Sequence, residues 1–351
     1  MKYSELINEF KNEKIGELKY QTIDSYVRRL RSQILPYFEE NKLELNNLND
    51  VRKWQNYLLV ERGHSIGYIN TLRNTLSSFS NFLVKYNYID TNMISKLPKI
   101  KDFNPVEIFD FWEFEEFKLF INEIEDPLWN CFFTVLYYSG CRVGEIRAMT
   151  WKQINFKKNQ ILINRSISKR PNEHGEFIIN LPKNNTSRTI TMNTELKKSL
   201  EKWKDICKNR KTFKDNNLVF MRADGESLST STIERKKNYY CSLTGVKQIR
   251  IHDFRHSNAS LLINMGAPVS VVSERLGHKD KRQTLNIYSH LFPSAEKMVV
   301  ERIDDLTNIF SNKHEKFAKA LLAFLGTVSD MNELNQKETE VMKAINEIAF
   351  S

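Results

Sequence analysis

Five short segments of the sequence carry side chains that could bind or attack an anion. In the first, a Ser-Gly-Cys turn precedes Arg142, and the helix that follows would place its amide groups beside the guanidinium, an arrangement that can hold an anion. The alternative is an intrahelical pair between Arg142 and Glu145, three residues further on. In the second, Lys183 lies between two predicted strands, where a solvated lysine at a hairpin tip is the alternative.

The other three segments lie nearer the C-terminus. His252 and Arg255 open a predicted helix, share one of its faces and could converge on a phosphate, although a surface polar contact is the alternative. His278 follows a Leu-Gly helix stop, where it could instead cap the helix. Tyr288 stands among apolar residues, a setting typical of a core tyrosine. Each segment alone favours the structural alternative, but the five together in this order are hard to explain that way.

Together the five segments resemble the tyrosine recombinase (phage integrase) family. SGCRVGEI, HDFRHSNASLLINMG, ERLGHKD and TLNIYSHL are similar to the family's motifs in their order, and the resemblance extends from about Thr22 to Phe310. FRHS and NIYSHL look closer to integrases of phages and conjugative elements than to the chromosomal enzymes. The catalytic residues that the resemblance implies are Arg142, Lys183, His252, Arg255, His278 and Tyr288, with Glu145 in support.

The chemistry that this resemblance implies is phosphoryl transfer through a covalent protein–DNA intermediate. Tyr288 would attack a backbone phosphate, leaving a 3′-phosphotyrosyl link and a free 5′ hydroxyl that later reseals the strand. Arg142 and Arg255 would hold the non-bridging oxygens and supply the positive charge that a metal ion supplies in other enzymes. Glu145 would hold Arg142 in register. We therefore expect no metal and no cofactor, and the sequence contains no GxxxxGK[ST] nucleotide-binding pattern.

The remaining implied roles concern protons and orientation. A phenol titrates near ~10, so help with its proton is useful, and His252 is the expected base while His278 hydrogen-bonds the phosphate. Lys183 would protonate the departing 5′ oxygen. His256 and His290 lie beside the motifs, and we expect structural roles for both.

The composition favours a nucleic-acid partner. Lys and Arg number 53 against 43 Asp and Glu, and the resulting charge of +10 and pI near 9.2 predict attraction to a polyanion. A length of 351 residues suggests two domains. The four cysteines form no CxxC pair, which argues against a zinc site or a disulfide framework. The charged N-terminus offers neither a signal peptide nor a membrane span, so we expect a soluble, cytoplasmic protein.

Residues 1–90 are expected to form a helical, core-type DNA-binding domain. Apolar residues recur at three- and four-residue steps in four segments, which are Ser4 to Phe10, Tyr20 to Phe38, Val51 to Val60 and Ile66 to Tyr86. Over 91–110 this periodicity fails, which predicts an extended basic linker. The candidate phosphate contacts of these two regions, each with a solvated face as the alternative, are Arg28, Arg29, Arg31, Arg52, Lys53, Arg73, Lys99 and Lys101.

Residues 111–311 are expected to form the catalytic domain, giving a fold that is mainly α with a small antiparallel β-sheet (α+β). The predicted strands are Ile161 to Ile167, Phe177 to Leu181 and Thr189 to Met192. The predicted helices are Glu113 to Ile124, Leu128 to Ser139, Thr194 to Asn209, Thr230 to Leu243, His252 to Met265, Pro268 to Leu276 and one around Tyr288. Arg188, which follows Lys183 in the chain, is a further candidate for contact with the DNA backbone.

Both ends of the sequence depart from the family's pattern. The chain begins almost at once with the helical domain, so an additional N-terminal arm-binding domain is not expected. After a terminal helix over Ala295 to Phe310, residues 312–351 form an acidic extension with two amphipathic segments. We predict that this extension packs against a neighbouring protomer or against its own catalytic domain.

The resemblance implies a site-specific recombinase that integrates and excises a mobile element. The alternatives are a chromosome-dimer-resolving recombinase, a type IB topoisomerase that reseals a single strand, and a non-catalytic DNA-binding regulator. The implied partner is double-stranded DNA at specific core sites, clamped between the two domains. The implied assembly is a homotetramer on DNA, with monomers in solution as one option and an excisionase as an open one. No membrane partner is expected.

Overall fold

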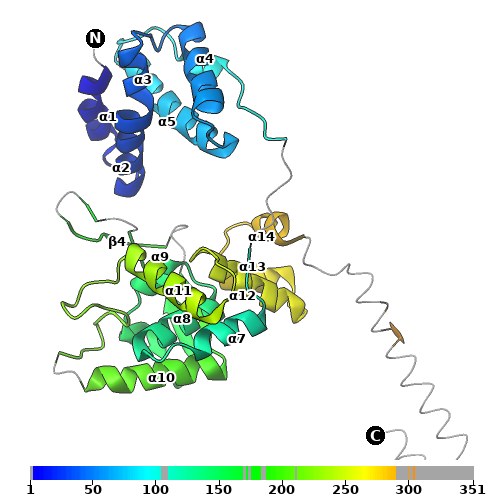
Figure 1. Cartoon of the computed structure of the whole chain (residues 1–351). Coiled ribbons are helices and arrows are strands. Elements are labelled where there is room, and N and C mark those ends of the chain that lie inside the picture. The colour runs from blue at the N-terminus through cyan, green and yellow to red at the C-terminus, as the bar shows by residue number, and fades with distance from the viewer. Residues whose placement is uncertain are drawn as a thin grey trace, which may run out of the picture. The chain divides into compact units, whose positions relative to one another are not determined.

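The computed structural model of the chain consists of two compact units, Met1–Ile108 and Phe109–Ser351. The residues that it describes are 3–103, 110–168, 171–172, 175–182, 187–209, 212–289, 300 and 303–304. In Figure 1 the first unit runs from blue to cyan and the described part of the second from green to gold. Within these described ranges, no helix combines the length and the apolar character needed to cross a membrane.

The first unit is a bundle of short helices around α5, Ile66–Lys85. Its other α-helices are α1 (Ile7–Lys14), α2 (Tyr20–Arg29), α3 (Leu35–Glu40), α4 (Leu48–Asn56) and α6 (Met93–Lys96). Helix α5 begins at Ser65, whose hydroxyl accepts a hydrogen bond from the Tyr68 amide at 3.3 Å. Its Leu72, Leu76 and Phe79 are buried in the core of the unit, so the predicted apolar face is the one that packs.

Two of the predicted helices contain π-helical turns. The turn over Leu30–Ile34 joins α2 to α3, and the turn over Tyr57–Glu61 extends α4. The helical segments expected from Tyr20 to Phe38 and from Val51 to Val60 are therefore present, but with wider turns inside them.

Residues 91–100, predicted as an extended linker, are partly helical and pack on the first unit. Ile94 of α6 is buried, and the Asn92 side chain caps this helix and donates a hydrogen bond to Asn81 at 2.7 Å. Arg73 of α5 donates to the Leu97 carbonyl at 2.7 Å and to Gln55. Because Arg73 is 3% exposed, its prediction as a surface contact with DNA is wrong.

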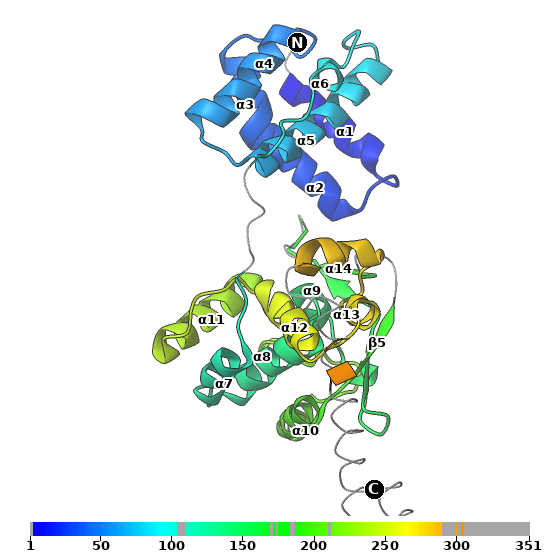
Figure 2. The same cartoon turned by 90° about the vertical axis from the view of Figure 1, so that its right-hand side faces the viewer.

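The second unit is built around α8, Pro127–Ser139, which is buried along most of its length. The surrounding helices are α7 (Phe114–Asn122), α9 (Val143–Arg147), α10 (Thr194–Lys208), α11 (Thr230–Thr244), α12 (Asp253–Asn264), α13 (Val269–Leu276) and α14 (Lys281–Tyr288). Figure 2 shows α12, α13 and α14 together on one side of this unit, where α13 packs against both of the others. Gly245 and Gly277, which follow the ends of α11 and α13, have φ values of 70° and 68°, which favour glycine.

Two small antiparallel sheets complete the second unit. The first has the order β1-β2-β5, formed by Ile154–Asn155, Gln160–Ile163 and Arg188–Thr191. The second pairs β3 (Ser166–Ile167) with β4 (Ile179–Asn180). The strand predicted over Ile161 to Ile167 is thus divided between two sheets.

The predicted fold class, mainly helical with small antiparallel sheets, is confirmed. Three of the predicted features lie outside the described residues. They are Lys183, the extension 312–351 and all but a few residues of the helix predicted over Ala295 to Phe310.

Candidate active site

Glu145 joins two of the predicted basic residues in the interior of the second unit. Its carboxylate is 1% exposed and accepts hydrogen bonds from the Arg142 amide at 2.9 Å and from Arg142 Nη1 at 3.1 Å. Arg188 Nη1 and Nη2 donate to the same carboxylate at 3.1 and 2.7 Å. Burial acts to raise the pKa of Glu145, but Arg188 and then Arg142 outweigh it and hold this pKa below its usual value. The predicted support of Arg142 by Glu145 is therefore a direct contact.

Arg188 occupies a different place from the one expected. Its side chain is only 9% exposed, and Nε donates to the Arg275 carbonyl at 2.9 Å, near the C-terminal end of α13. The guanidinium thus links strand β5 to Glu145 and to the backbone of α13, the helix that ends shortly before His278. We expected Arg188 to contact the DNA backbone, whereas in this structure its charge is already paired with Glu145.

Arg255 lies on α12, and its guanidinium is buried in the second unit. Its side chain is buried, and Nη1 donates to the Gly140 carbonyl at 2.8 Å. Nη2 has no hydrogen-bond partner among the described residues. Burial, and then the positive charge of Arg142, lower the pKa of Arg255 to about 10. An anion bound here would satisfy the donor and offset the repulsion between the two guanidinium groups.

The two predicted catalytic histidines both have a lowered pKa in this structure. Burial, and then Arg255 and Arg142, lower the pKa of His278 to about 4. His278 Nδ1 lies 2.7 Å from the Thr284 hydroxyl, and a neutral ring that accepts this hydroxyl carries its proton on Nε2. Although part of the His252 residue is exposed, burial of its ring and then the charge of Arg255 lower its pKa. Both rings are therefore neutral near pH 7.

Tyr288, the predicted nucleophile, is buried at the end of α14. Its Oη lies 2.7 Å from Nδ1 of His256, which is on α12 directly after Arg255. Tyr288 is 2% exposed and His256 is 5% exposed. Burial raises the pKa of Tyr288 far above its usual value, against the opposing effect of Arg255. In the DNA-free protein the side chain of Tyr288 is thus a neutral phenol.

The sequence predicts a structural role for His256, and its contact with Tyr288 was not predicted. Burial, and then His252, lower the pKa of His256 to about 4. The signal available in the sequence was spacing, because residues four apart on a helix share a face and His256 stands four after His252. The two rings do lie edge to face, with their centroids 5.3 Å apart.

The structure therefore gathers four of the six predicted catalytic residues around Arg255. Arg255 interacts electrostatically with four of them, which are Arg142, His252, His278 and Tyr288. Lys183 cannot be placed, since it lies outside the described residues. In the part of the chain that the structure describes, no cluster of three or more His, Cys, Asp or Glu side chains is arranged to hold a metal ion.

The candidate DNA contacts of the first unit differ in exposure. Arg28 and Arg29 are half-buried, and they bond Asp24 at 3.1 Å and Thr75 at 3.3 Å respectively. The exposed candidates are Arg31, Arg52, Lys53, Lys99 and Lys101. These seven residues remain predicted contacts.

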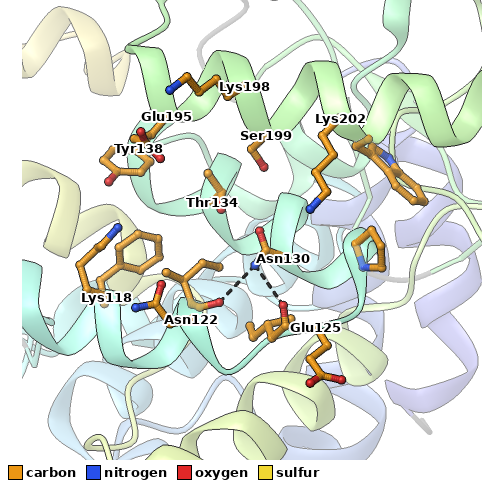
Figure 3. Close-up of a pocket in the computed structure, with 15 residues that line it drawn as sticks. Lys118, Asn122, Glu125, Asn130, Thr134, Tyr138, Glu195, Lys198, Ser199 and Lys202 are labelled. Atoms are coloured by element: carbon orange, nitrogen blue, oxygen red, sulfur yellow. Dashed lines mark hydrogen bonds between the residues drawn. The ribbon is translucent and has the colours of Figure 1, made fainter.

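A polar cavity of about 420 Å³ lies apart from this cluster, between α7, α8 and α10 (Figure 3). Lys118, Lys198 and Lys202 line it together with Glu125 and Glu195. None of the predicted catalytic residues is among its lining residues. The cavity is therefore not part of the candidate active site.

Comparisons with known proteins identify the family of the chain. The model of the Phage integrase family matches residues 111–294, and the model of the phage integrase N-terminal SAM-like domain matches residues 2–59. The chain is 29% identical over 290 residues to the ICEBs1 integrase of Bacillus subtilis (strain 168), covering 79% of this chain and 76% of that protein. It is 30% identical over 304 residues to the tyrosine recombinase XerD of Rickettsia bellii (strain RML369-C), covering 82% and 94% respectively.

A solved structure with a similar fold is the Tn1549 transposon integrase in complex with a circular intermediate DNA. Its TM-score is 0.65 at 19% sequence identity, over 86% of this chain and 99% of that one. At this identity the likeness concerns the fold, and the fold is the same.

Proposed function

The chain belongs to the phage integrase family and is a tyrosine site-specific recombinase, and we propose that Tyr288 cuts and rejoins DNA through a 3′-phosphotyrosyl intermediate. The observation that carries this proposal is the buried Arg255, whose Nη2 has no partner among the described residues and which interacts electrostatically with Arg142 and the phenol of Tyr288. A phosphodiester is the anion that would use this donor and stand in reach of a nucleophile.

Several of the described residues have distinct roles in binding the phosphate. Arg142 and Arg255 hold the non-bridging oxygens, and Glu145 fixes the direction of Arg142 through the bonds described above. His278 is neutral, so its Nε2–H donates to the phosphate without adding a charge to a site that already holds three guanidinium groups. Arg188 is the third of these groups and acts through Glu145 rather than on the phosphate.

The reaction needs no external energy source, because the phosphotyrosyl bond conserves the phosphodiester linkage. Attack by the Tyr288 oxygen forms the new P–O bond and releases the 5′ oxygen, which takes a proton from Lys183. In the second half the free 5′ hydroxyl of a partner strand attacks the phosphotyrosyl link, and the phenol leaves. Exchange of partners between the two halves is what distinguishes recombination from strand relaxation.

The substrate that we propose is a pair of specific double-stranded DNA sites that belong to a mobile element. The similarity to the ICEBs1 integrase supports this role. The similarity to XerD favours resolution of chromosome dimers as the second candidate. Two sites with two protomers each require a homotetramer on DNA, assembled from monomers in solution, and an excisionase would give the reaction its direction.

Strand exchange between two marked duplexes tests the proposed function. One duplex from the element's junction and one from the chromosomal target carry different labels and are incubated with the full chain. A product that carries both labels supports recombination of a mobile element. Relaxation of a supercoiled plasmid without doubly labelled product would favour a topoisomerase. Exchange between two copies of one chromosomal site, without exchange between element and target, would favour dimer resolution.

A further inference from the structure

The hydroxyl of Tyr288 has one hydrogen-bonding partner among the described residues, and that partner is His256. The two side chains come from different helices, α14 and α12, and both are buried. A buried nucleophile and a ring nitrogen 2.7 Å apart form the pair that activated hydroxyl nucleophiles use in other enzymes. This contact is the geometric requirement for transfer of the phenol proton.

We propose that His256, rather than His252, accepts the proton of Tyr288 when its oxygen attacks the phosphate. This inference rests on the proposed function, because it takes Tyr288 as the nucleophile. It gives a catalytic role to a residue that stands outside the six predicted ones.

The position of His252 supports this assignment. No hydrogen bond joins His252 to Tyr288 within the described part of the second unit, and His252 meets the His256 ring edge to face instead. The His256 ring therefore contacts both the His252 ring and the Tyr288 ring. A base must reach the proton that it removes within about 3.2 Å or through one water molecule, and among the described residues only His256 does so directly.

The proton transfer is coupled to formation of the new bond. As the Tyr288 oxygen bonds to phosphorus, its proton moves to His256 Nδ1, and the P–O5′ bond breaks with protonation of the leaving oxygen by Lys183. No free phenolate accumulates, which matters because burial makes it unstable. In the resealing half the imidazolium returns the proton to the departing phenol.

His256 is available as an acceptor in the DNA-free state because it is neutral. Burial first, and then His252, Arg255 and Arg250, disfavour the charge that His256 gains during attack, and the negative phosphate would offset this effect when it enters the site. DNA binding is thus what makes His256 basic enough to act. Besides burial, the groups that act on the His256 ring are His252, Asp253, Arg255, Arg250, His278 and Tyr288.

Single-turnover cleavage of a duplex with a 5′-bridging phosphorothiolate isolates this step. The sulfur leaves without protonation, so Lys183 is not needed and the proton of the nucleophile is the one that limits the rate. We compare the wild type with His256→Asn, whose amide replaces the ring without being a base, and with His252→Asn. The matched control is His64→Asn, another histidine that packs against a tyrosine, Tyr68, in the first unit.

We expect His256→Asn to form the covalent adduct about 100-fold more slowly or worse, in line with loss of a general base. His252→Asn should lose less than about 10-fold by the same scale, and His64→Asn should match the wild type. The wild-type rate should fall at low pH as His256 becomes protonated, and this fall should be absent in His256→Asn. A purely structural defect would lower the rate equally at every pH, and His256→Gln gives a second variant if His256→Asn proves unstable on heating.

Two results overturn the inference. If His256→Asn and His256→Gln cleave as fast as the wild type or faster, the contact only holds the nucleophile at rest. If His252→Asn alone loses about 100-fold, the base is His252. Failure of the proposed function looks different, because the adduct would then persist in Tyr288→Phe.

Discussion

Replacing Arg188 with Gln should destabilise the second unit strongly, although Arg188 is no longer expected to contact DNA. The change removes two bonds to the Glu145 carboxylate, at 2.7 and 3.1 Å, from a pair whose side chains are 9% and 0% exposed. Removing one partner of a buried ion pair costs about 3–5 kcal/mol. Arg142 keeps its bond to Glu145 at 3.1 Å, so we expect the lower end, about 3 kcal/mol.

The assay is urea unfolding of the full chain followed by tryptophan fluorescence, which reports mainly on the second unit because it holds Trp112, Trp129, Trp151 and Trp203. Lys208→Gln is the matched control, since its bond to Asp205 at 3.2 Å joins two exposed side chains and should contribute roughly 0.5 kcal/mol. A loss below about 1 kcal/mol in Arg188→Gln, similar to that of an exposed pair, would refute the reasoning.

The pH dependence gives this prediction a second check. Glu145 has a lowered pKa in the folded protein, so it contributes stability above its unfolded pKa of about 4.3, and this contribution is lost as pH falls through the folded value. Without Arg188 the burial of Glu145 is less well offset, and its pKa rises. The difference in stability between wild type and Arg188→Gln should therefore be largest near pH 7 and shrink on acidification.

Three further predictions follow from the geometry. Gly140→Ala should lower the free energy of unfolding more than Gly245→Ala in the same urea assay. Both glycines have positive φ, at 62° and 70°, which costs a non-glycine residue about 1–2 kcal/mol. Only at Gly140 would the added Cβ also clash, because it would lie 2.4 Å from Asn258 Oδ1. Arg255→Lys should abolish adduct formation while retaining DNA binding in a gel shift, because lysine cannot hold both the Gly140 carbonyl and a phosphate oxygen as the planar guanidinium does. The affinity for DNA should fall roughly a thousand-fold or more between about 50 and 200 mM salt in a fluorescence-anisotropy titration, and a flat dependence would contradict a phosphate-dominated interface.

The helices could be predicted well from the sequence because their apolar spacing is local information. Leu72, Leu76 and Phe79 repeat at helical steps and are the residues that α5 buries. The division of the predicted strand over Ile161 to Ile167 could not be anticipated, since it depends on partners far along the chain. Ile161 pairs with Ile190, while Ile167 pairs with Ile179 in the other sheet.

The candidate site shows the same limit at the level of single side chains. The order and types of the catalytic residues were visible in the sequence, but their partners were not. The sequence suggests that Arg188 is a surface cation, but its partner Glu145 lies 43 positions earlier in the chain. Arg73 is likewise buried by contacts with a segment distant in sequence. His256 bonds Tyr288 across 32 positions of the chain, which only the packing of α12 and α14 brings together.

The most direct test of the central claim is covalent trapping of Tyr288 on DNA. A nicked suicide duplex from the recombination site is incubated with wild type or Tyr288→Phe, without metal or ATP, and run on a denaturing gel. The variant loses only the hydroxyl and its buried bond to His256, which should cost about 1–3 kcal/mol. This is less than the stability of a typical domain, so we expect the variant to fold and bind DNA. We predict a 3′-linked protein–DNA adduct with the wild type and none with Tyr288→Phe. An adduct that persists in the variant, or a wild type that binds its site and never forms one, would contradict the account.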